Sequence, residues 1–224
     1  SLKVYNNIIT TGYMPAITVF GSGVSEIYNN VISDIYYEGI NVTDKIPENT
    51  TPDLFPPPAG IIYNNTIINT DNGANAIKIF AYQTPLGHQV YNNLMVEKGT
   101  DYDYPAKGMY IKGDQPIKLT SGNNICYPDA ASAGFVDATG KNYHLQPTST
   151  AVNAGRDMSD FGLKTDYDNT VRPQQGKYDV GAFELKDGTT SPPGANAGSD
   201  VTITLPCDFV TLDGSSSTAS GGNT

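Results

Sequence analysis

An asparagine pair recurs between residues 6 and 124, and it is the feature that most limits how this chain can fold. An aliphatic residue and a tyrosine precede four of the copies, and a fifth keeps only the two asparagines. The pairs are Asn6-Asn7, Asn29-Asn30, Asn64-Asn65, Asn92-Asn93 and Asn123-Asn124, at offsets of 23, 35, 28 and 31 residues. A unit repeated at such intervals, with connections of variable length, indicates a solenoid whose loops absorb the insertions.

Each copy carries the marks of short strands. The second residue after each pair is apolar, and a small residue further on opens a run that alternates between apolar and polar side chains. The runs are 16–20, 39–42, 76–80 and 108–112, and their period of two predicts half-buried strands. A further short strand, such as 25–28, leads into the next pair. We therefore predict an all-β, right-handed parallel β-helix with three short strands per turn. Leucine-rich repeats are the main rival, but their leucine pattern is absent.

The asparagines themselves have a physical role in such a stack. Equivalent corners lie about 4.8 Å apart, so the amide of one asparagine can donate to the carbonyl of the next. Each such bond contributes roughly 0.5–1.5 kcal/mol net, and asparagine also tolerates the left-handed backbone of a sharp corner. We expect the first residue of each pair to hold the turn and the second to form an inward ladder. The predicted ladder residues are Asn7, Asn30, Asn65, Asn93 and Asn124.

The tyrosine before each full pair falls in the same register. Stacked turns would therefore align Tyr5, Tyr28, Tyr63 and Tyr91 along one outer face. An aromatic stack of this kind stabilises a fold by about 0.5–1.5 kcal/mol per pair beyond the burial itself. We favour this structural role over the alternative, a sugar-binding strip.

The charge balance excludes some partners. Lys and Arg number 13 against 23 Asp and Glu, for a net charge of −10. Nucleic-acid binding needs a basic footprint, so it is not expected, and acidic polysaccharides would need a bridging cation. No apolar run approaches the roughly 20 residues of a membrane span. Cys126 and Cys207 are too few for a disulfide framework and lack metal-ligand spacing. Because residues 1–3 lead straight into a repeat, we expect a fragment of a longer protein.

Two later segments carry a dense motif. Residues 134–155 read GFVDATGKNYHLQPTSTAVNAG and residues 166–184 read DYDNTVRPQQGKYDVGAFE. Together they resemble the closing segment of secreted bacterial β-helix proteins with the pectate-lyase-like fold. The resemblance covers about 50 residues, supports the predicted fold for residues 1–185, and is nearly silent on chemistry, because members include lyases, hydrolases and proteins of unknown activity.

The charged residues of this segment admit two roles. They are Asp166, Asp168, Arg172, Asp179 and Glu184. Paired carboxylates perform acid–base work, and Asp-x-Asp can hold Ca²⁺. Because the resemblance implies these residues whatever the activity, we favour a cap in which Arg172 pairs with a carboxylate and covers the open end of the solenoid.

The composition changes after residue 185. Residues 186–194, KDGTTSPPG, form a predicted linker. Residues 195–224 resemble the first two strands of a PKD-type immunoglobulin-like module, through 195–198 and 211–217. A complete sandwich needs roughly 100 residues, so the module would be truncated. The resemblance implies a bacterial protein that is secreted or held at the cell surface.

A solenoid places function on its long connections. Connections 43–59 and 81–89 would wall a groove from one corner, and connection 97–108 lies at another. The expected groove contains Asp53, and the predicted sugar-binding residues are Phe55, Tyr82, His88, Tyr102 and Tyr104. Asp101 and Asp103 are candidate Ca²⁺ ligands. An ordinary solvated loop is the alternative for each.

The resemblance also indicates what an enzyme of this fold would use. Its lyases abstract a proton with a basic residue, a type represented here by Lys78, Lys107, Lys112 and His88, whereas the hydrolase motifs are absent. We expect an extracellular, monomeric, polysaccharide-associated β-helix, the C-terminal part of a lyase- or hydrolase-type protein. The alternative is a non-catalytic surface or adhesion β-helix that binds glycans or a protein partner.

Overall fold

A computed structural model describes most of the first 186 residues of the chain. The described ranges are 1–20, 23–43, 59–70, 75–81, 87–97, 108–113 and 118–186, together with Ser215. The chain divides into two units, Ser1–Leu185 and Lys186–Thr224. The predicted linker 186–194 and module 195–224 lie outside the described residues except at Lys186 and Ser215.

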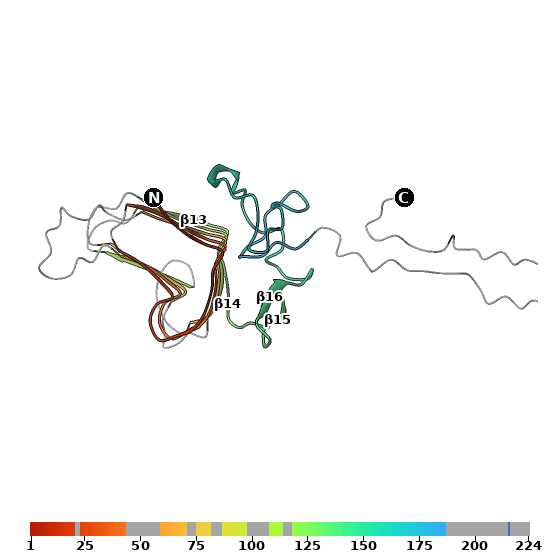
Figure 1. Cartoon of the computed structure of the whole chain (residues 1–224), viewed down its shortest axis with the longest axis horizontal. Coiled ribbons are helices and arrows are strands. Elements are labelled where there is room, and N and C mark those ends of the chain that lie inside the picture. The colour runs from red at the N-terminus through yellow and green to blue at the C-terminus, as the bar shows by residue number, and fades with distance from the viewer. Residues whose placement is uncertain are drawn as a thin grey trace, which may run out of the picture. The chain divides into compact units, whose positions relative to one another are not determined.

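The first unit is built from three parallel sheets (Figure 1). Sheet A contains β1 (Leu2–Tyr5), β4 (Val24–Tyr28), β7 (Ala59–Tyr63), β10 (His88–Tyr91) and β13 (Leu119–Gly122). Sheet B contains β2 (Ile8–Gly12), β5 (Val31–Ile35), β8 (Thr66–Thr70), β11 (Leu94–Glu97) and β14 (Ile125–Tyr127). Sheet C contains β3 (Ile17–Phe20), β6 (Ile40–Thr43), β9 (Ile77–Ala81) and β12 (Met109–Gly113). The chain visits the sheets in the order A, B, C, so each repeat adds one strand to each sheet. The predicted all-β, parallel architecture is confirmed, and it is consistent with a β-helix.

Alternation along each strand directs apolar residues to a common core. In β3, Ile17 and Val19 are buried while Thr18 and Phe20 are exposed. Register then stacks equivalent residues, so that Ile17, Ile40, Ile77 and Met109 form one inward column. The apolar positions after the asparagine pairs behave likewise. Ile32, Ile67 and Met95 are fully buried, and Ile9 and Cys126 pack against them.

The asparagine ladder is present as predicted. Each second asparagine donates its Nδ2 to the Oδ1 of the next at 2.9 Å, from Asn7 through Asn30, Asn65 and Asn93 to Asn124. The backbone N–H of each donor residue points to the same oxygen at 3.0–3.2 Å. The first asparagine of every pair has a positive φ of 50–53°, which is the left-handed corner. As expected, the first asparagine of each pair forms the corner and the second forms the ladder.

The tyrosine column forms, but much of it lies inside the protein. Tyr5 stacks on Tyr28, and Tyr28 stacks on Tyr63, with ring centroids 4.9 Å apart in both cases. Tyr63 and Tyr91 are only 1% and 6% exposed, because Phe161 and its neighbours pack against them. A continuous sugar-binding strip along this column is therefore excluded, and the structural role is the one that fits.

Residues 128–185, which we call the closing segment, follow β14. They contain the antiparallel strands β15 (Phe135–Asp137) and β16 (Asn142–Leu145) and the short 3-10 helix η2 (Ser159–Phe161). Two apolar clusters join this segment to outward residues of the stack. One lies over sheet A at Tyr63 and Tyr91, and the other lies over sheet B at Ile68 and Leu94. Among the described residues, neither cluster includes a member of sheet C.

The corner asparagines hold the closing segment in place. Their side-chain amides donate to its backbone carbonyls, from Asn29 to Thr165, Asn64 to Asp179 and Gly181, Asn92 to Arg156, and Asn123 to Ala154. These contacts run along four successive repeats, and Figure 1 shows the segment beside the corner between β13 and β14. The expectation that this segment covers the end of the stack is therefore corrected, because it packs along the side. Within the described ranges, no helix is long and apolar enough to cross a bilayer.

Candidate functional site

Most of the residues that the sequence predicts for a binding site lie outside the described residues. They are Asp53, Phe55, Tyr82, Asp101, Tyr102, Asp103, Tyr104 and Lys107. The strands that flank them still indicate where their connections start and end. Connections 44–58 and 82–86 both leave sheet C, after β6 and β9, and connection 98–107 leads from β11 into sheet C at β12. All three connections therefore meet sheet C.

His88 does not lie on the surface. It is the first residue of β10, faces the same side of the strand as the core residue Val90, and is 1% exposed. Its Nδ1 accepts the Gly60 N–H at 3.0 Å. The expectation that His88 lines an external groove is therefore corrected, because strand alternation turns the side chain inward.

The charged residues of the closing segment form a buried network around Arg172. Its Nη1 donates to Glu184 Oε2 at 2.8 Å and to the Asp179 carbonyl, and its Nη2 donates to the Gly181 carbonyl. Both side chains of the Arg172–Glu184 pair are 0% exposed. Burial raises the pKa of Glu184 to about 7, while the Arg172 guanidinium opposes that rise. Arg172 therefore pairs with a carboxylate as predicted.

Backbone N–H groups donate hydrogen bonds to the aspartate carboxylates of this network. Asp166 accepts from the N–H groups of Asp168, Thr170 and Glu184. Asp179 accepts from those of Asn153 and Leu185. Such bonds stabilise a segment that has little regular secondary structure, and they leave these groups no surface on which to meet a substrate. The described residues contain no cluster of three or more His, Cys, Asp or Glu that could hold a metal ion.

The remaining acidic residue of the predicted set lies nearer the surface. Asp168 Oδ2 lies 2.5 Å from His144 Nε2, and His144 Nδ1 lies 2.6 Å from Asn142 Oδ1. The imidazole also packs against the Phe183 ring, with centroids 4.1 Å apart. These contacts tie strand β16 to the rest of the closing segment, so they fit the structural role that we expect for His144.

Sheet C presents the candidate site. Its outward side chains form two rows that run across successive strands. Thr18, Asn41 and Lys78 make a polar row, and Phe20, Thr43 and Phe80 make an adjacent row with an aromatic residue at each end. Phe20 is 57% exposed, Phe80 is half-buried, and Thr43 between them is buried. We call this surface the sheet C face.

The ammonium of Lys78, the charged group of the sheet C face that the structure describes, is paired with a carboxylate. Lys78 Nζ lies 2.6 Å from Glu38 Oε1, and it also lies 5.8 Å from the centroid of the Phe80 ring. Glu38 is 8% exposed, so the carboxylate of this ion pair is largely buried. The Oδ1 atom of Asn41 is buried and accepts no hydrogen bond within the described part of the chain. Lys112 belongs to β12, and its side chain lies outside the described residues.

Sequence reasoning identified Lys78 but missed its neighbours. Phe20 and Phe80 occupy the same position of the alternating run, at the end of Ala-Ile-Thr-Val-Phe and of Ala-Ile-Lys-Ile-Phe. Superposing the runs would have placed both rings in one row. No sequence signal marks Glu38, because it precedes its strand and meets Lys78 across 40 residues.

Comparison with known proteins gives no relative for this chain: no family model, curated protein or solved structure matches it.

Proposed function

We propose that this chain is a secreted or cell-surface carbohydrate-binding protein whose sheet C face holds a neutral polysaccharide. In this proposal the three sheets belong to a right-handed parallel β-helix of the pectate-lyase-like kind, followed by the start of a PKD-type module. The observation that carries it is the pairing of an aromatic row with a polar row on sheet C, which neither apolar cluster of the closing segment reaches among the residues that the structure describes.

The geometry of the two rows suits an extended sugar chain. Phe20 and Phe80 lie in one row two strands apart, so about 10 Å separates them along the stack. An aromatic face packs against the C–H face of a pyranose ring. Thr18 and Lys78 in the adjacent row supply a hydroxyl and an ammonium group for sugar hydroxyls, whereas the Asn41 Oδ1 between them is buried. A chain lying along the stack would meet both kinds of contact at once.

Charge favours a neutral chain over an acidic one. The protein carries a net charge of −10, and Glu38 compensates the ammonium of Lys78. A uronate would therefore approach against the field of the whole protein and compete with Glu38 for Lys78. This argues for binding rather than for lyase chemistry, which acts on uronates. Calcium at Asp101 and Asp103 remains a prediction of the sequence.

The proposal is tested by affinity electrophoresis and calorimetry with neutral and acidic plant, algal and bacterial polysaccharides, with and without Ca²⁺. We expect a neutral chain to bind and the Phe20→Ala and Phe80→Ala variants each to weaken binding about tenfold, as loss of one stacked ring implies. Val136→Ala is a matched control, because Val136 is 50% exposed on β15. Retention of full affinity in both phenylalanine variants would refute the sheet C face as the site. Release of new reducing ends would instead identify an enzyme.

A further inference from the structure

Sheet C brings together an amine, a primary amide and a carboxylate. Asn41 on β6 and Lys78 on β9 are register partners of neighbouring parallel strands, so they share the outer face and their Cα atoms lie about 4.8 Å apart. Lys78 Nζ in turn lies 2.6 Å from Glu38 Oε1. The cluster therefore combines a nucleophile, an electrophilic carbon and a proton acceptor.

The cluster is partly shielded from water. Glu38 is 8% exposed, and the side chain of Lys78 is 29% exposed. The Oδ1 atom of Asn41 is buried and accepts no hydrogen bond from any residue that the structure describes. A buried amide oxygen without a donor costs free energy, so its position beside a lysine and a carboxylate calls for an explanation.

We infer that Lys78 and Asn41 form a covalent amide bond between strands β6 and β9. Glu38 accepts a proton from the Lys78 ammonium, and the neutral Nζ attacks the Cγ atom of Asn41. The Cγ–Nδ2 bond then breaks, and Glu38 and Nζ each pass one proton to the departing nitrogen, which leaves as an ammonium ion. One C–N bond forms and one breaks, the positive charge of Lys78 departs with the ammonium, and no oxidant or reductant is consumed.

A second lysine–glutamate pair lies on sheet A and lacks the amide. Lys3 Nζ lies 3.0 Å from Glu26 Oε2, and the two residues are register partners on β1 and β4. The next residue of that row is Ile61 on β7, whose side chain has no electrophilic carbon. Lys3 therefore makes the same ion pair as Lys78 but has nothing to attack.

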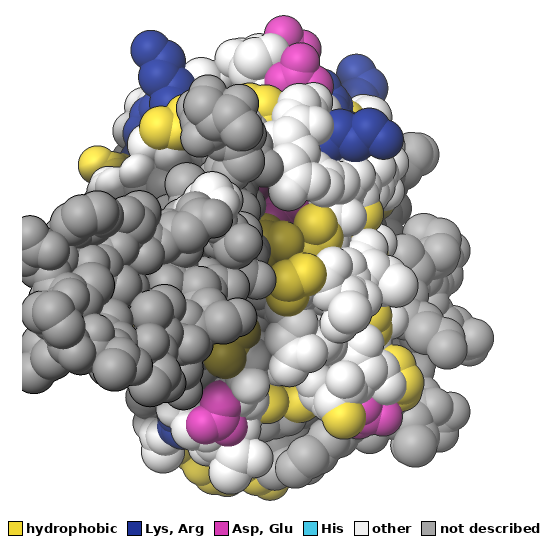
Figure 2. All heavy atoms as spheres, turned by 90° about the vertical axis from the view of Figure 1, so that its right-hand side faces the viewer, with side chains coloured by type: hydrophobic (Ala, Val, Ile, Leu, Met, Phe, Trp, Pro, Cys, Tyr) yellow, Lys and Arg dark blue, Asp and Glu magenta, His cyan; other side chains and the backbone are white. Residues whose placement is uncertain are grey.

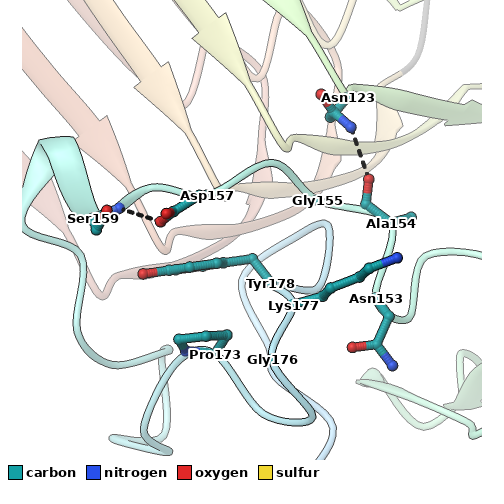
Figure 3. A pocket seen from close by; sticks show the side chains of 10 residues that line it. All are labelled: Asn123, Asn153, Ala154, Gly155, Asp157, Ser159, Pro173, Gly176, Lys177 and Tyr178. Carbon is teal, nitrogen blue, oxygen red and sulfur yellow. Dashed lines mark hydrogen bonds between the residues drawn. The ribbon is translucent and has the colours of Figure 1, made fainter.

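A groove in the closing segment has the opposite deficiency. It has a volume of about 520 Å³, and Figure 3 shows Lys177 and Asn153 at one end and Asp157 at the other. On the face that carries the closing segment, the basic side chains stand at the edges (Figure 2). Lys177 is exposed and forms no ion pair within the described ranges. It therefore has an amide nearby but lacks the paired carboxylate that Lys78 has.

The bond would join the second and third repeats of the stack. It would close a loop from residue 41 to residue 78, and a link between residues so far apart in sequence restricts the unfolded chain. The rings of Phe20 and Phe80 are unchanged by it, and Nζ keeps one N–H donor. The inference therefore stands whether or not the sheet C face binds a polysaccharide.

Mass spectrometry of the whole denatured chain tests the bond. We expect the wild type to weigh one ammonia less than its sequence, and a protease digest to contain one branched peptide that joins Asn41 to Lys78. Asn41→Ala and Lys78→Met should each have the full sequence mass. Asn41→Asp should still form the link but lose water instead of ammonia. Glu38→Gln should slow the reaction about a hundredfold, the usual contribution of a general base.

Lys3→Met and Lys177→Met are the matched controls, and both should keep the ammonia deficit. A wild-type chain with its full sequence mass would overturn the inference, whatever the variants do. So would a deficit that persists in Lys78→Met, or one confined to an unbranched peptide, as when an asparagine cyclises onto its own backbone. Circular dichroism checks that Glu38→Gln is folded, and a folded variant that forms the link as fast as the wild type would overturn the role of Glu38.

Discussion

Asn92 and Arg156 exchange two hydrogen bonds across 64 residues of sequence. The Arg156 N–H donates to Asn92 Oδ1 at 2.9 Å, and Asn92 Nδ2 donates to the Arg156 carbonyl at 3.0 Å. The Arg156 guanidinium also lies 4.3 Å from the centroid of the Tyr91 ring. A corner side chain thus pairs with the closing segment as a neighbouring strand would. The first asparagine of a repeat therefore does more than hold its turn.

Replacement of Asn92 by alanine should loosen the closing segment. The change orphans the N–H and carbonyl of Arg156, and we expect a loss of about 2–4 kcal/mol in the free energy of unfolding. Urea denaturation measures that loss, and hydrogen exchange at the Arg156 amide should become faster.

Asn6→Ala is the control for this change. Asn6 has the same left-handed backbone, with φ of 53° at both positions, and no described residue of the closing segment bonds to it. Asn6→Ala should lower the free energy of unfolding by about 1–2 kcal/mol, which is the strain of an alanine in the left-handed conformation. Equal losses of unfolding free energy in Asn92→Ala and Asn6→Ala would show that the hydrogen bonds between Asn92 and Arg156 add nothing to stability.

An asparagine in the interior of the ladder should contribute more to the free energy of unfolding than one at its end. Asn65 donates to Asn93 Oδ1 and to the Ile27 carbonyl, and its own Oδ1 accepts two bonds from Asn30. We expect Asn65→Ala to lower the free energy of unfolding by about 3–5 kcal/mol, because several buried partners lose their bonds. Asn7→Ala, at the exposed first position, should cost about 1 kcal/mol.

Asn65→Asp separates hydrogen bonding from packing. Aspartate keeps the shape of the side chain but faces Asn93 Oδ1 with an oxygen instead of an N–H donor. We expect it to destabilise at least as strongly as alanine at neutral pH. A well-tolerated aspartate would mean that shape, and not the donor–acceptor chain, maintains the ladder.

The sequence was informative wherever one repeat copies another. Asn65 and its equivalents could be assigned because each repeat adds one residue to the same column, so a pattern in the chain becomes a pattern in space. The position of Arg156 against Asn92 has no such signal, because the closing segment does not repeat. The prediction that His88 faces an external groove was wrong because the sequence does not show where β10 begins. Once His88 is known to be the first residue of that strand, alternation turns its side chain inward. Within the candidate site, Lys78 could be named but its partner Glu38 could not, since strand register alone brings them together.

The Arg172–Glu184 pair predicts a variant whose stability depends on pH over a wider range. Arg172→Met leaves a buried carboxylate without its cation, which typically costs about 3–5 kcal/mol. Burial already raises the pKa of Glu184 to about 7, and loss of the guanidinium raises it further. The folded state then holds a proton that the unfolded state, with a pKa near 4.5, releases.

In the wild type this loss of stability runs from the unfolded pKa near 4.5 to the folded pKa of about 7, whereas in Arg172→Met it should continue above pH 7, by at most about 1.4 kcal/mol per unit. Denaturant unfolding at several pH values, compared with wild type, measures this slope. Lys177→Met also removes one cation, but from an exposed site, and should follow the wild-type slope. A slope that levels off near pH 7 in Arg172→Met, as in the wild type, would show that the guanidinium does not lower the pKa of Glu184.

The tyrosine column predicts how the protein responds to alkali. Burial raises the pKa of Tyr63 far above 10, and the nearby Glu26 carboxylate adds to the effect. Below pH 10 the phenol is protonated in both the folded and unfolded states, so no stability is lost. Above pH 10 the unfolded chain releases this proton and the folded chain keeps it, so stability falls by about 1.4 kcal/mol per pH unit for this residue.

Phenolate absorbance follows this difference directly. We expect Tyr63→Phe to leave the native titration unchanged and to reduce only the absorbance that appears on unfolding. A smaller native amplitude in Tyr63→Phe would mean that solvent reaches Tyr63, and that the closing segment does not seal the column as its contacts with Phe161 indicate.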